Sequence, residues 1–388
     1  MLKFTMNNKD LKSMIEKGVA AINKKTSIST LTRLYFQVDD NGVVKILGTD
    51  HEHYVEIRND SAWDTNPGVF GIDVNDLKII TTMNGNITLE DISTEKENKI
   101  NVKAGKKCIT IPRYENTDIF LPSMDETEEC FLIVRESWLL DTTVNLLTYT
   151  SSNENNKMMQ VFNFNTSQRR VEALDGNRIG MRTLNSQKIE KEGENVLLHK
   201  KCVPVFKKVL SKKSDNEIKI YQDKKYVKVE GKDFTYVIRK IEGQYFKVEK
   251  MLLKDYEYSF NVDKGDILNV MKYDCELIKG DEAKKPVVLH SENGTLYVYL
   301  RTNRYEVFDT IDTANNYMND DLYIGFNPNY LSEAFSVVDS ENPLCQGVNN
   351  KGPLMIYGEE YSFMILPVTI NGLNIEEINV YIASNKVA

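Results

Sequence analysis

Residues Arg169 to Met181 read Arg-Arg-Val-Glu-Ala-Leu-Asp-Gly-Asn-Arg-Ile-Gly-Met. Apolar and polar residues alternate from Val171 to Leu174, which is typical of a β-strand with one buried face. The Asp-Gly pair at 175–176 is a strong turn signal, because glycine accepts positive φ and the aspartate side chain bonds its own backbone. The pattern predicts a hairpin or a strand-to-strand corner, whose second strand leaves with Arg178 exposed and Ile179 on the other face.

Length and composition favour a multidomain globular protein. The chain has 388 residues, which is too long for one ordinary core and predicts two or three domains. No apolar run reaches the roughly 18 residues of a membrane span. The N-terminus lacks a signal-peptide pattern and the five cysteines form no CxxC pair, which predicts a cytoplasmic protein without structural zinc. The net charge of −8 argues against indiscriminate nucleic-acid binding, although local basic patches can override the total.

One pattern occurs three times along the chain: a short strand, a polar turn and a run with helical periodicity. Its matched helix positions are Leu11, Leu139 and Ile267, and the interval from the first to the second equals the interval from the second to the third. A second pattern of the same kind occurs in each third of the chain, and the same interval separates its positions Val203 and Leu331. Strand-like runs follow the helices. The sequence therefore predicts an α+β protein of three similar domains, each made of two strand-helix-strand-strand half-units.

The repeat also predicts where the domains end. An acidic run near 123–128 and a break near 253–255 interrupt the pattern. The expected domains are residues 1–127, 128–254 and 255–370, followed by a C-terminal extension at 371–388. Within that extension, Ile375 to Ile382 indicates a helical turn and a strand. Three unrelated α+β domains are the alternative, which the repeated order of half-units disfavours.

The hairpin and the repeat together resemble the bacterial DNA sliding clamp, the β subunit of DNA polymerase III. That family carries an Asp-Gly-His-Arg-Leu run at about this position along the chain, matched here by Leu174 to Ile179. Phe326 to Leu331 resembles its Phe-Asn-x-x-Tyr-Leu block, and Met364 to Val368 resembles its terminal strand. The resemblance runs from Phe4 to about Ile370, where the family normally ends.

The resemblance implies a DNA clamp fold and a function. The three domains would assemble head-to-tail into a ring, as a homodimer around double-stranded DNA without regard to its sequence. The chain would be a processivity factor rather than an enzyme, with no cofactor and no membrane partner. It would tether the DNA polymerase catalytic subunit, be opened by a clamp-loader ATPase, and bind other proteins through short peptides.

The resemblance also implies three sets of residues. The partner-peptide pocket would comprise Leu174, Gly176, Asn177, Arg178, Ile179, Asn327, Tyr330, Pro353, Met364, Leu366, Pro367 and Val368. The DNA contacts would be Lys25, Lys157, Lys200 and Lys201. The dimer interface would be Ile109, Ile111, Leu277 and Ile278.

Some positions depart from the family pattern. Asn177 replaces the family histidine, Tyr245 to Val248 replaces a Phe-Pro-Asp-Tyr type of stretch, and Thr369 replaces a basic residue. These departures and the C-terminal extension leave open a phage- or plasmid-borne clamp paralogue that serves a different polymerase.

Lysines concentrate in one short segment of this acidic chain. Six lysines and no acidic residue lie between Val196 and Lys213. A single basic helix is often only a solvated face. Basic helices at equivalent repeat positions are better explained by a shared surface that contacts phosphates, with binding that depends on salt rather than on sequence. We expect this helix to run from about Lys200 to Lys213.

The alternative function is that of a metal-dependent nucleic-acid-processing enzyme that uses Asp50, His51 and His53. A His-x-His pair on a strand places both imidazoles on one face, beside a carboxylate. An exposed strand edge of mixed polar residues is the simpler interpretation. The sequence has no nucleophile elbow and no phosphate-binding glycine motif, so other catalysis has no motif support.

Overall fold

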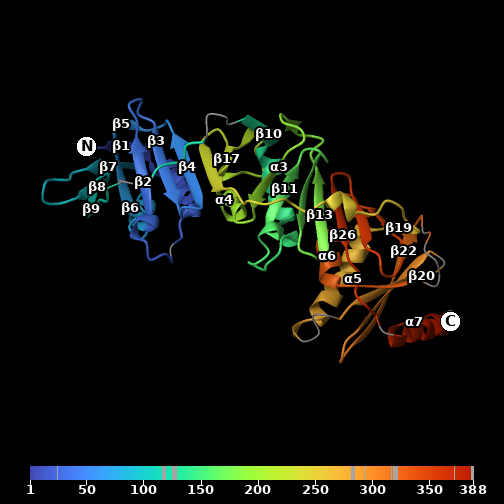
Figure 1. The fold of residues 1–388 in the computed structure, drawn as a ribbon. Coiled ribbons are helices and arrows are strands. Elements are labelled where there is room, and N and C mark those ends of the chain that lie inside the picture. Colours follow the sequence, from blue (N-terminus) through green and yellow to red (C-terminus); the bar gives the residue numbers. More distant parts are fainter. Residues whose placement is uncertain are drawn as a thin grey trace. The chain divides into compact units, whose positions relative to one another are not determined.

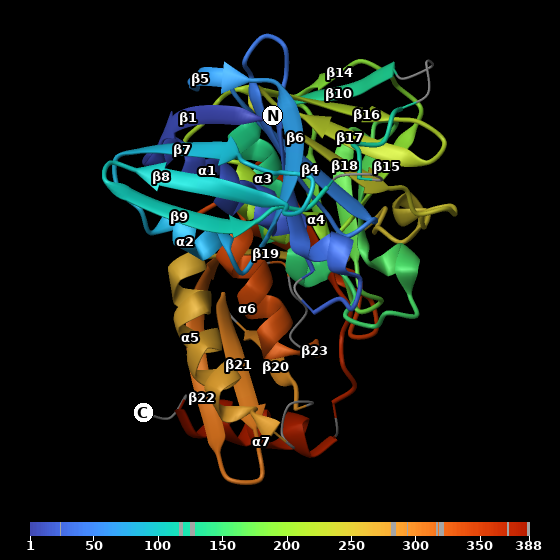
Figure 2. The ribbon, with the colours of Figure 1, turned by 90° about the vertical axis from the view of Figure 1, so that its left-hand side faces the viewer.

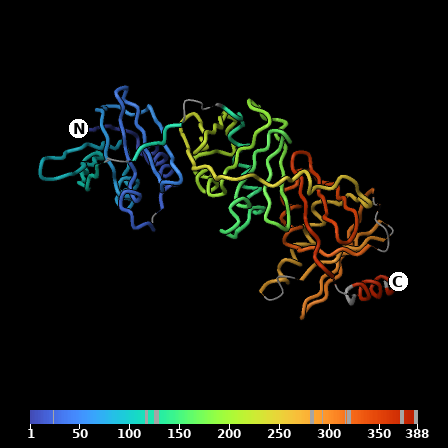
Figure 3. The backbone as a smooth tube through the Cα atoms, viewed as in Figure 1, coloured from blue at the N-terminus to red at the C-terminus, as the bar shows by residue number. Residues whose placement is uncertain are grey.

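The computed structural model describes residues 1–23, 25–115, 119–124, 129–280, 285–292, 294–315, 317, 322–370 and 372–385. The expected first domain boundary, near 123–128, lies largely outside these residues. By its internal contacts the chain divides into two compact units. Unit 1 comprises Met1–Val144 and Ser186–Glu242, and unit 2 comprises Asn145–Asn185 and Gly243–Ala388. The chain therefore enters unit 2, returns to unit 1 and enters unit 2 again, as the colours of Figure 3 show.

Six half-units make up the chain (Figure 1), in the order that the sequence predicted. The structure adds a third strand after each helix. The first two half-units are β1 (Lys3–Asn7), α1 (Asn8–Gly18), β2 (Arg33–Val38), β3 (Val44–Thr49) and β4 (His53–Asn59), then β6 (Gly68–Asp73), α2 (Leu77–Thr81), β7 (Asn86–Asp91), β8 (Lys99–Ala104) and β9 (Lys107–Pro112). A short strand, β5 (Trp63–Asn66), lies between them.

The third and fourth half-units repeat this order. They are β10 (Glu129–Arg135), α3 (Glu136–Asn145), β11 (Val161–Asn165), β12 (Arg170–Leu174) and β13 (Arg178–Thr183), then β15 (Asn195–His199), α4 (Cys202–Val209), β16 (Glu217–Gln222), β17 (Tyr226–Glu230) and β18 (Phe234–Arg239). The short β14 (Lys188–Ile189) separates them.

The last two half-units are followed by a C-terminal helix. They are β19 (Tyr258–Val262), α5 (Lys264–Leu277), β20 (Val287–Glu292), β21 (Thr295–Arg301) and β22 (Glu306–Ala314), then β23 (Tyr323–Phe326), α6 (Pro328–Val337), β24 (Leu344–Gly347), β25 (Leu354–Tyr357) and β26 (Tyr361–Ile365). The final helix is α7 (Gly372–Asn385). No helix within the described part of the chain is long and apolar enough to cross a membrane.

The strands of each unit form antiparallel sheets. Unit 1 holds a five-stranded sheet in the order β5-β1-β7-β8-β9 and a nine-stranded sheet in the order β14-β10-β16-β17-β18-β4-β3-β2-β6. In unit 2 the strands follow the order β11-β12-β13-β26-β25-β24-β19-β22-β21-β20-β23. Two of these pairings, β4 with β18 and β13 with β26, each join the third strands that follow two different helices.

The repeat positions form the core, as their equal spacing predicted. Leu11, Leu139 and Ile267 are at most 1% exposed, and so are Val203 and Leu331. Because α1, α3, α4, α5 and α6 each bury this position against a sheet, the repeat fixes the packing of these five half-units.

The polar turn before a helix acts as its N-cap. The side chains of Asn7, Asp263 and Asn327 accept hydrogen bonds from backbone N–H groups in the first turns of α1, α5 and α6, at 2.9–3.0 Å. Such a cap satisfies an N–H group that has no partner within the helix and contributes about 1 kcal/mol. The Asn or Asp of the repeat therefore has a local structural role.

The C-terminal extension is helical throughout its described part, so the predicted strand in it is wrong. The isoleucines suggested a strand, but Ile378 and Ile382 are four residues apart and face the same side of α7. There they are at most 5% exposed and pack on Val288 and Tyr299. The ring of Tyr381 stacks on Phe308 at a centroid distance of 4.0 Å. The C-terminal helix therefore packs on strands β20, β21 and β22 of the last repeat.

Candidate functional site

The Asp175-Gly176 hairpin is present as the sequence predicted. The N–H of Asp175 donates to the carbonyl of Arg178 at 3.3 Å, and the Asp175 side chain accepts from the N–H groups of Asn177 and Arg178 at 2.9 and 3.1 Å. Gly176 has φ 96°, a left-handed conformation that disfavours other residues. This turn places Arg178 at the first position of β13.

Arg178 is buried, at 6% exposure, so the prediction of an exposed side chain is wrong. Its guanidinium bonds the Asp175 carboxylate at 3.0 Å and the carbonyl of Thr148 at 2.7 Å, and it forms an ion pair with Glu333 of α6. It also lies 4.1 Å from the ring centre of Tyr330 and 4.9 Å from that of Tyr149. These partners satisfy the buried charge, which would otherwise cost several kcal/mol.

The carboxylates keep this guanidinium charged. Burial alone would lower the pKa of Arg178, but Glu333 and Asp175 outweigh it and raise the pKa above its ordinary value. Sequence patterns had not identified Glu333, Thr148 or Tyr149 as neighbours of Arg178. The available signal was the spacing of Tyr330 and Glu333, which lie three residues apart and share one face of α6.

Strand pairing brings the end of β26 to the hairpin. Arg178 pairs with Ile365 and Ile179 with Met364. Past the strand end, the N–H of Leu366 donates to the carbonyl of Asn177 at 2.9 Å. The two sequence segments that were predicted to form one pocket are therefore adjacent.

The remaining predicted residues join the same region through backbone contacts. Leu354 of β25 pairs with Ile365, which places Pro353 beside the start of the segment that follows β26. The N–H of Val368 donates to the carbonyl of Gly325 at 2.7 Å, close to Asn327. We call the twelve residues of this region the Arg178 surface: Leu174, Gly176, Asn177, Arg178, Ile179, Asn327, Tyr330, Pro353, Met364, Leu366, Pro367 and Val368.

The Arg178 surface mixes buried and accessible side chains. Leu174, Ile179 and Met364 are at most 5% exposed and form its base, whereas Leu366 is 39% exposed. Asn177 is exposed and Tyr330 is half-buried. Apolar area beside an amide and a fixed guanidinium is the chemistry that holds and orients a short peptide.

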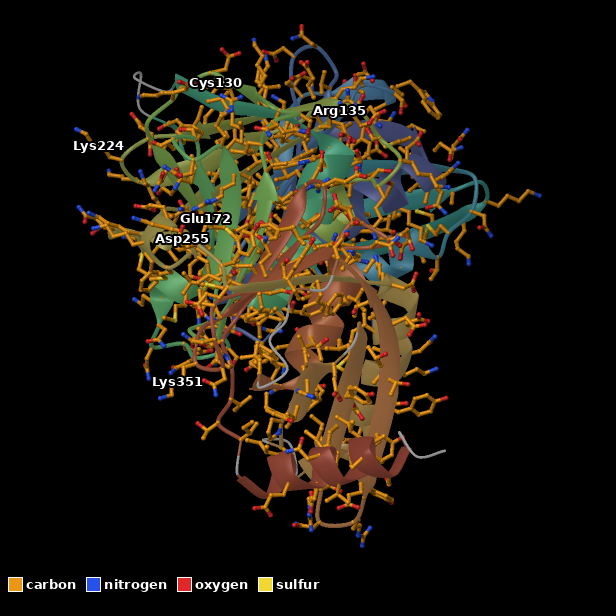
Figure 4. All side chains as sticks on the ribbon, turned by 90° about the vertical axis from the view of Figure 1, so that its right-hand side faces the viewer. Cys130, Arg135, Glu172, Lys224, Asp255 and Lys351 are labelled. Atoms are coloured by element: carbon orange, nitrogen blue, oxygen red, sulfur yellow. The ribbon has the colours of Figure 1, made fainter. Side chains whose placement is uncertain are left out.

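The opposite end of the β13–β26 pairing carries a second feature. An open depression of about 470 Å³ lies there, between the β11–β12 and β25–β26 turns. Arg182 at its wall bonds Glu360 at 2.8 Å and lies 4.7 Å from the ring centre of Tyr361. Glu172 on the adjacent β12, labelled in Figure 4, is fully buried, and burial raises the pKa of its carboxyl. None of the residues predicted for the pocket lines this depression.

The predicted DNA-contacting lysines are accessible or partly so. Lys25, Lys157 and Lys201 are exposed, and Lys200 is half-buried. Lys201 precedes α4 and pairs with Glu52 at 3.1 Å. Within unit 1, α4 packs beside α1, so lysines of both helices belong to one region of that unit.

The basic helix is shorter than predicted. It ends at Val209 rather than Lys213, because the chain turns extended at Leu210. Beyond it, the N–H of Ser211 and the hydroxyl of Ser214 bond the buried carboxylate of Glu136, both at 2.6 Å. Lys212 and Lys213 therefore lie outside the helix.

The Asp50-His51-Glu52-His53 segment does not form the predicted His-x-His face. His51 lies in the β3–β4 turn with φ 73°, and His53 is buried, with Nδ1 2.6 Å from the hydroxyl of Tyr236. Asp50 accepts from the N–H groups of Glu52 and His53 at 3.0 and 2.7 Å, so its carboxylate holds the turn. β4 is also an interior strand, so the simpler interpretation as an exposed edge is wrong too. Among the residues that the structure describes, no group of three His, Cys, Asp or Glu side chains could hold a metal ion.

The predicted interface residues lie at the expected elements with unequal exposure. Ile109 and Ile111 belong to β9, the last strand in the order of its sheet. Ile109 is half-buried and Ile111 is 3% exposed. Leu277 ends α5 half-buried, and the following Ile278 is 2% exposed and therefore belongs to the core of its own chain.

Comparisons with known proteins agree with this fold over nearly the whole chain. No family model matches the sequence. The beta sliding clamp of Lactococcus lactis subsp. lactis is 24% identical over 405 residues, covering 96% of this chain and 100% of that protein. The crystal structure of a putative DNA polymerase III beta subunit from Eubacterium rectale has a TM-score of 0.84 at 22% identity, covering 95% of this chain and all of that one. The DnaN sliding clamp of Bartonella birtlesii, solved bound to griselimycin, has a TM-score of 0.84 at 16% identity, with the same coverage. The resemblance to the clamp family and the clamp fold are confirmed.

Proposed function

We infer that this chain is a sliding clamp of the DNA polymerase III beta-subunit type, a processivity factor that holds a replicative polymerase on duplex DNA. One observation carries the inference. The six half-units form a fold that matches the solved putative DNA polymerase III beta subunit over 95% of this chain and over the full length of that one. Relatives that bear the name beta sliding clamp support it by sequence. Nothing in the described residues favours the metal-dependent enzyme.

The ring consists of two chains joined head-to-tail. Each chain contributes three domains, residues 1–127, 128–254 and 255–370, with α7 as an addition to the third. Heterologous contacts of this kind close when the rotation between copies suits a ring. The strand edge with Ile109 and Ile111 on one copy meets the α5 end with Leu277 on the next.

DNA passes through the ring without being read. Lys25, Lys200, Lys201 and Lys157 contact phosphates, so affinity falls steeply with salt and does not depend on base sequence. The chain itself performs no catalysis and uses no cofactor. It acts in the cytoplasm, and an ATP-driven loader opens it.

The Arg178 surface receives the clamp-binding peptides of the polymerase, the loader and other partners. Leu366 and Tyr330 offer apolar contact, and Asn177 offers hydrogen bonds that set the direction of the peptide. Griselimycin, a ligand of the Bartonella birtlesii clamp, gives a defined molecule with which to measure binding at this surface.

Retention on circular DNA tests the function directly. The chain is loaded by its clamp loader on a nicked circle, and the circle is then cut once. A sliding clamp stays on the closed circle and leaves through the ends after the cut, because it is held by topology and not by affinity. Equal retention before and after the cut, or no retention on the circle, would contradict the inference.

A further inference from the structure

Two strand pairings within the chain show how repeats join. β4 pairs with β18 in unit 1, and β13 pairs with β26 in unit 2. β18 begins at Phe234 and β26 begins at Tyr361. Counting the interval between these two residues back from Phe234 reaches Lys107, the first residue of β9. β9 is thus the third member of this series, and it ends its sheet.

β22 is the third strand after α5, as β4 and β13 are the third strands after α1 and α3. It pairs with β21 along its length, but with β19 only at Thr313 and Ala314. Within the described part of the chain, its other side is therefore open before these residues. The proposed ring, on which this inference rests, joins the open side of β22 to the open side of β9 from a second copy.

Side-chain alternation fixes which residues of β22 face the helices. Phe308 points away from α5, since it stacks on Tyr381 of α7. Val307, Asp309 and Ile311 therefore point toward α5. Figure 2 shows α5 running alongside β21 and β22, with α7 crossing near the ends of these strands.

The same reasoning applies to β9. On β18, Tyr236 faces α4, because its ring packs edge-on against Phe206 at a centroid distance of 5.5 Å. Ile109 stands two positions after the start of β9, as Tyr236 does on β18, so Lys107 and Ile109 share the helix-facing side of β9. An antiparallel pairing with β22 brings Lys107 into the layer that contains Asp309.

That layer holds a carboxylate without a partner among the described residues. The buried side of α5 reads Ile267, Met271, Asp274 and Ile278. Asp274 is 1% exposed, and neither of its carboxylate oxygens has a hydrogen-bond partner in the described part of the chain. Burial and the nearby Asp309 raise the pKa of Asp274 to about 7.

An arrangement of this kind is unfavourable in a single chain. A buried charge without a partner is unfavourable, and the negative end of the α5 dipole makes it more so. Asp309, half-buried on the strand, has its own pKa raised by burial. The two carboxylates thus form a site that lacks a cation among the described residues.

We propose that a second copy of the chain completes this site, with the ammonium group of Lys107 of the partner subunit paired to Asp309 and, behind it, Asp274. Lys107 is exposed on the open edge of β9. The ion pair stabilises the closed ring and fixes the register of the β9–β22 pairing, because a shift by one residue would turn the lysine to the other face of the sheet.

The test compares dimer dissociation constants of full-length variants by sedimentation at several concentrations. Lys107→Met is expected to weaken the dimer about tenfold or more, as for a desolvated interface pair. Lys106→Met, next to it in the β8–β9 turn, is the matched control and should match the wild type. In an Asp309→Asn background, Lys107→Met should have little further effect, because the two residues form one interaction.

The outcomes separate this inference from the proposed function. A wild-type dimer whose dissociation constant is the same after Lys107→Met overturns the inference alone, as does an additive effect of Lys107→Met and Asp309→Asn. A wild-type chain that stays monomeric overturns the proposed ring as well. Asp274→Asn removes the buried charge, so its fold should persist in circular dichroism while the dimer weakens; a dimer as tight as the wild type would count against the pair.

Discussion

The guanidinium of Arg178 lies 4.1 Å from the ring centre of Tyr330, and this contact joins the Asp175-Gly176 hairpin to helix α6. Both residues belong to unit 2, where Glu333 of the same helix pairs with Arg178. The contact holds the planar charge in one orientation at the edge of the Arg178 surface. Lysine carries the same charge, but its ammonium group is not planar and lacks the paired N–H donors of a guanidinium.

Under the proposed function griselimycin binds the Arg178 surface, and Arg178→Lys is expected to weaken this binding about tenfold, because the stacking and hydrogen bonds that hold the guanidinium in place, worth roughly 1–2 kcal/mol, are lost. Isothermal titration calorimetry measures the change. Arg182→Lys is the matched control, since Arg182 also pairs with a glutamate and stacks on a tyrosine but lies at the other end of β13. Equal losses in both variants would show a general effect on the fold instead.

Gly180→Ala should destabilise unit 2. A methyl group at this position would lie 2.7 Å from the ring of Tyr149 and 2.9 Å from Leu146, both of which are fully buried. Crowding of this kind costs about 1–3 kcal/mol. Urea unfolding gives the change in midpoint, and an unchanged midpoint would mean that the packing around Tyr149 is looser than described.

The C-terminal helix offers a matched pair of substitutions. Ile378 is fully buried against Val288 and Tyr299, whereas Val380 on the same helix is 68% exposed. Ile378→Ala should cost about 2–4 kcal/mol and Val380→Ala close to nothing. Thermal unfolding distinguishes them, and similar effects of the two changes would contradict the packing of α7.

DNA affinity should respond to the ion pair between Lys201 and Glu52. Glu52→Gln frees Lys201 and removes a negative charge beside it, so binding of a short labelled duplex should strengthen about twofold to threefold at low salt. Glu97→Gln is the control, because Glu97 pairs with Lys99 in a similarly exposed bridge outside the predicted DNA contacts. Fluorescence anisotropy across a salt series measures both, and an unchanged affinity for Glu52→Gln would remove Lys201 from the DNA-contacting set.

The repeat was predictable because burial follows a fixed spacing. Leu11, Leu139 and Ile267 are apolar, equally spaced and buried, so sequence periodicity alone located the helices and the half-unit order. The turn at Asp175-Gly176 was predictable for a local reason, since its bonds lie within one short segment of the chain.

What sequence could not predict depends on contacts between distant segments. Arg178 was expected to be exposed because its burial requires Glu333, 155 positions away in the chain. Ile378 and Ile382 suggested a strand by residue type, although their spacing of four also fits the helix that packs on β21. The end of α4 was misplaced because Glu136, far from it in sequence, draws Ser211 and Ser214 away.

Small-angle scattering with absolute mass shows whether two chains close into a ring in solution. Two chains of 44.6 kDa make a closed ring of about 89 kDa. Because the ring has a central hole, its distribution of interatomic distances differs from that of a solid particle of the same mass. A sliding clamp is expected to show this mass and this hollow profile. A compact particle with the mass of one chain at all concentrations would contradict the ring.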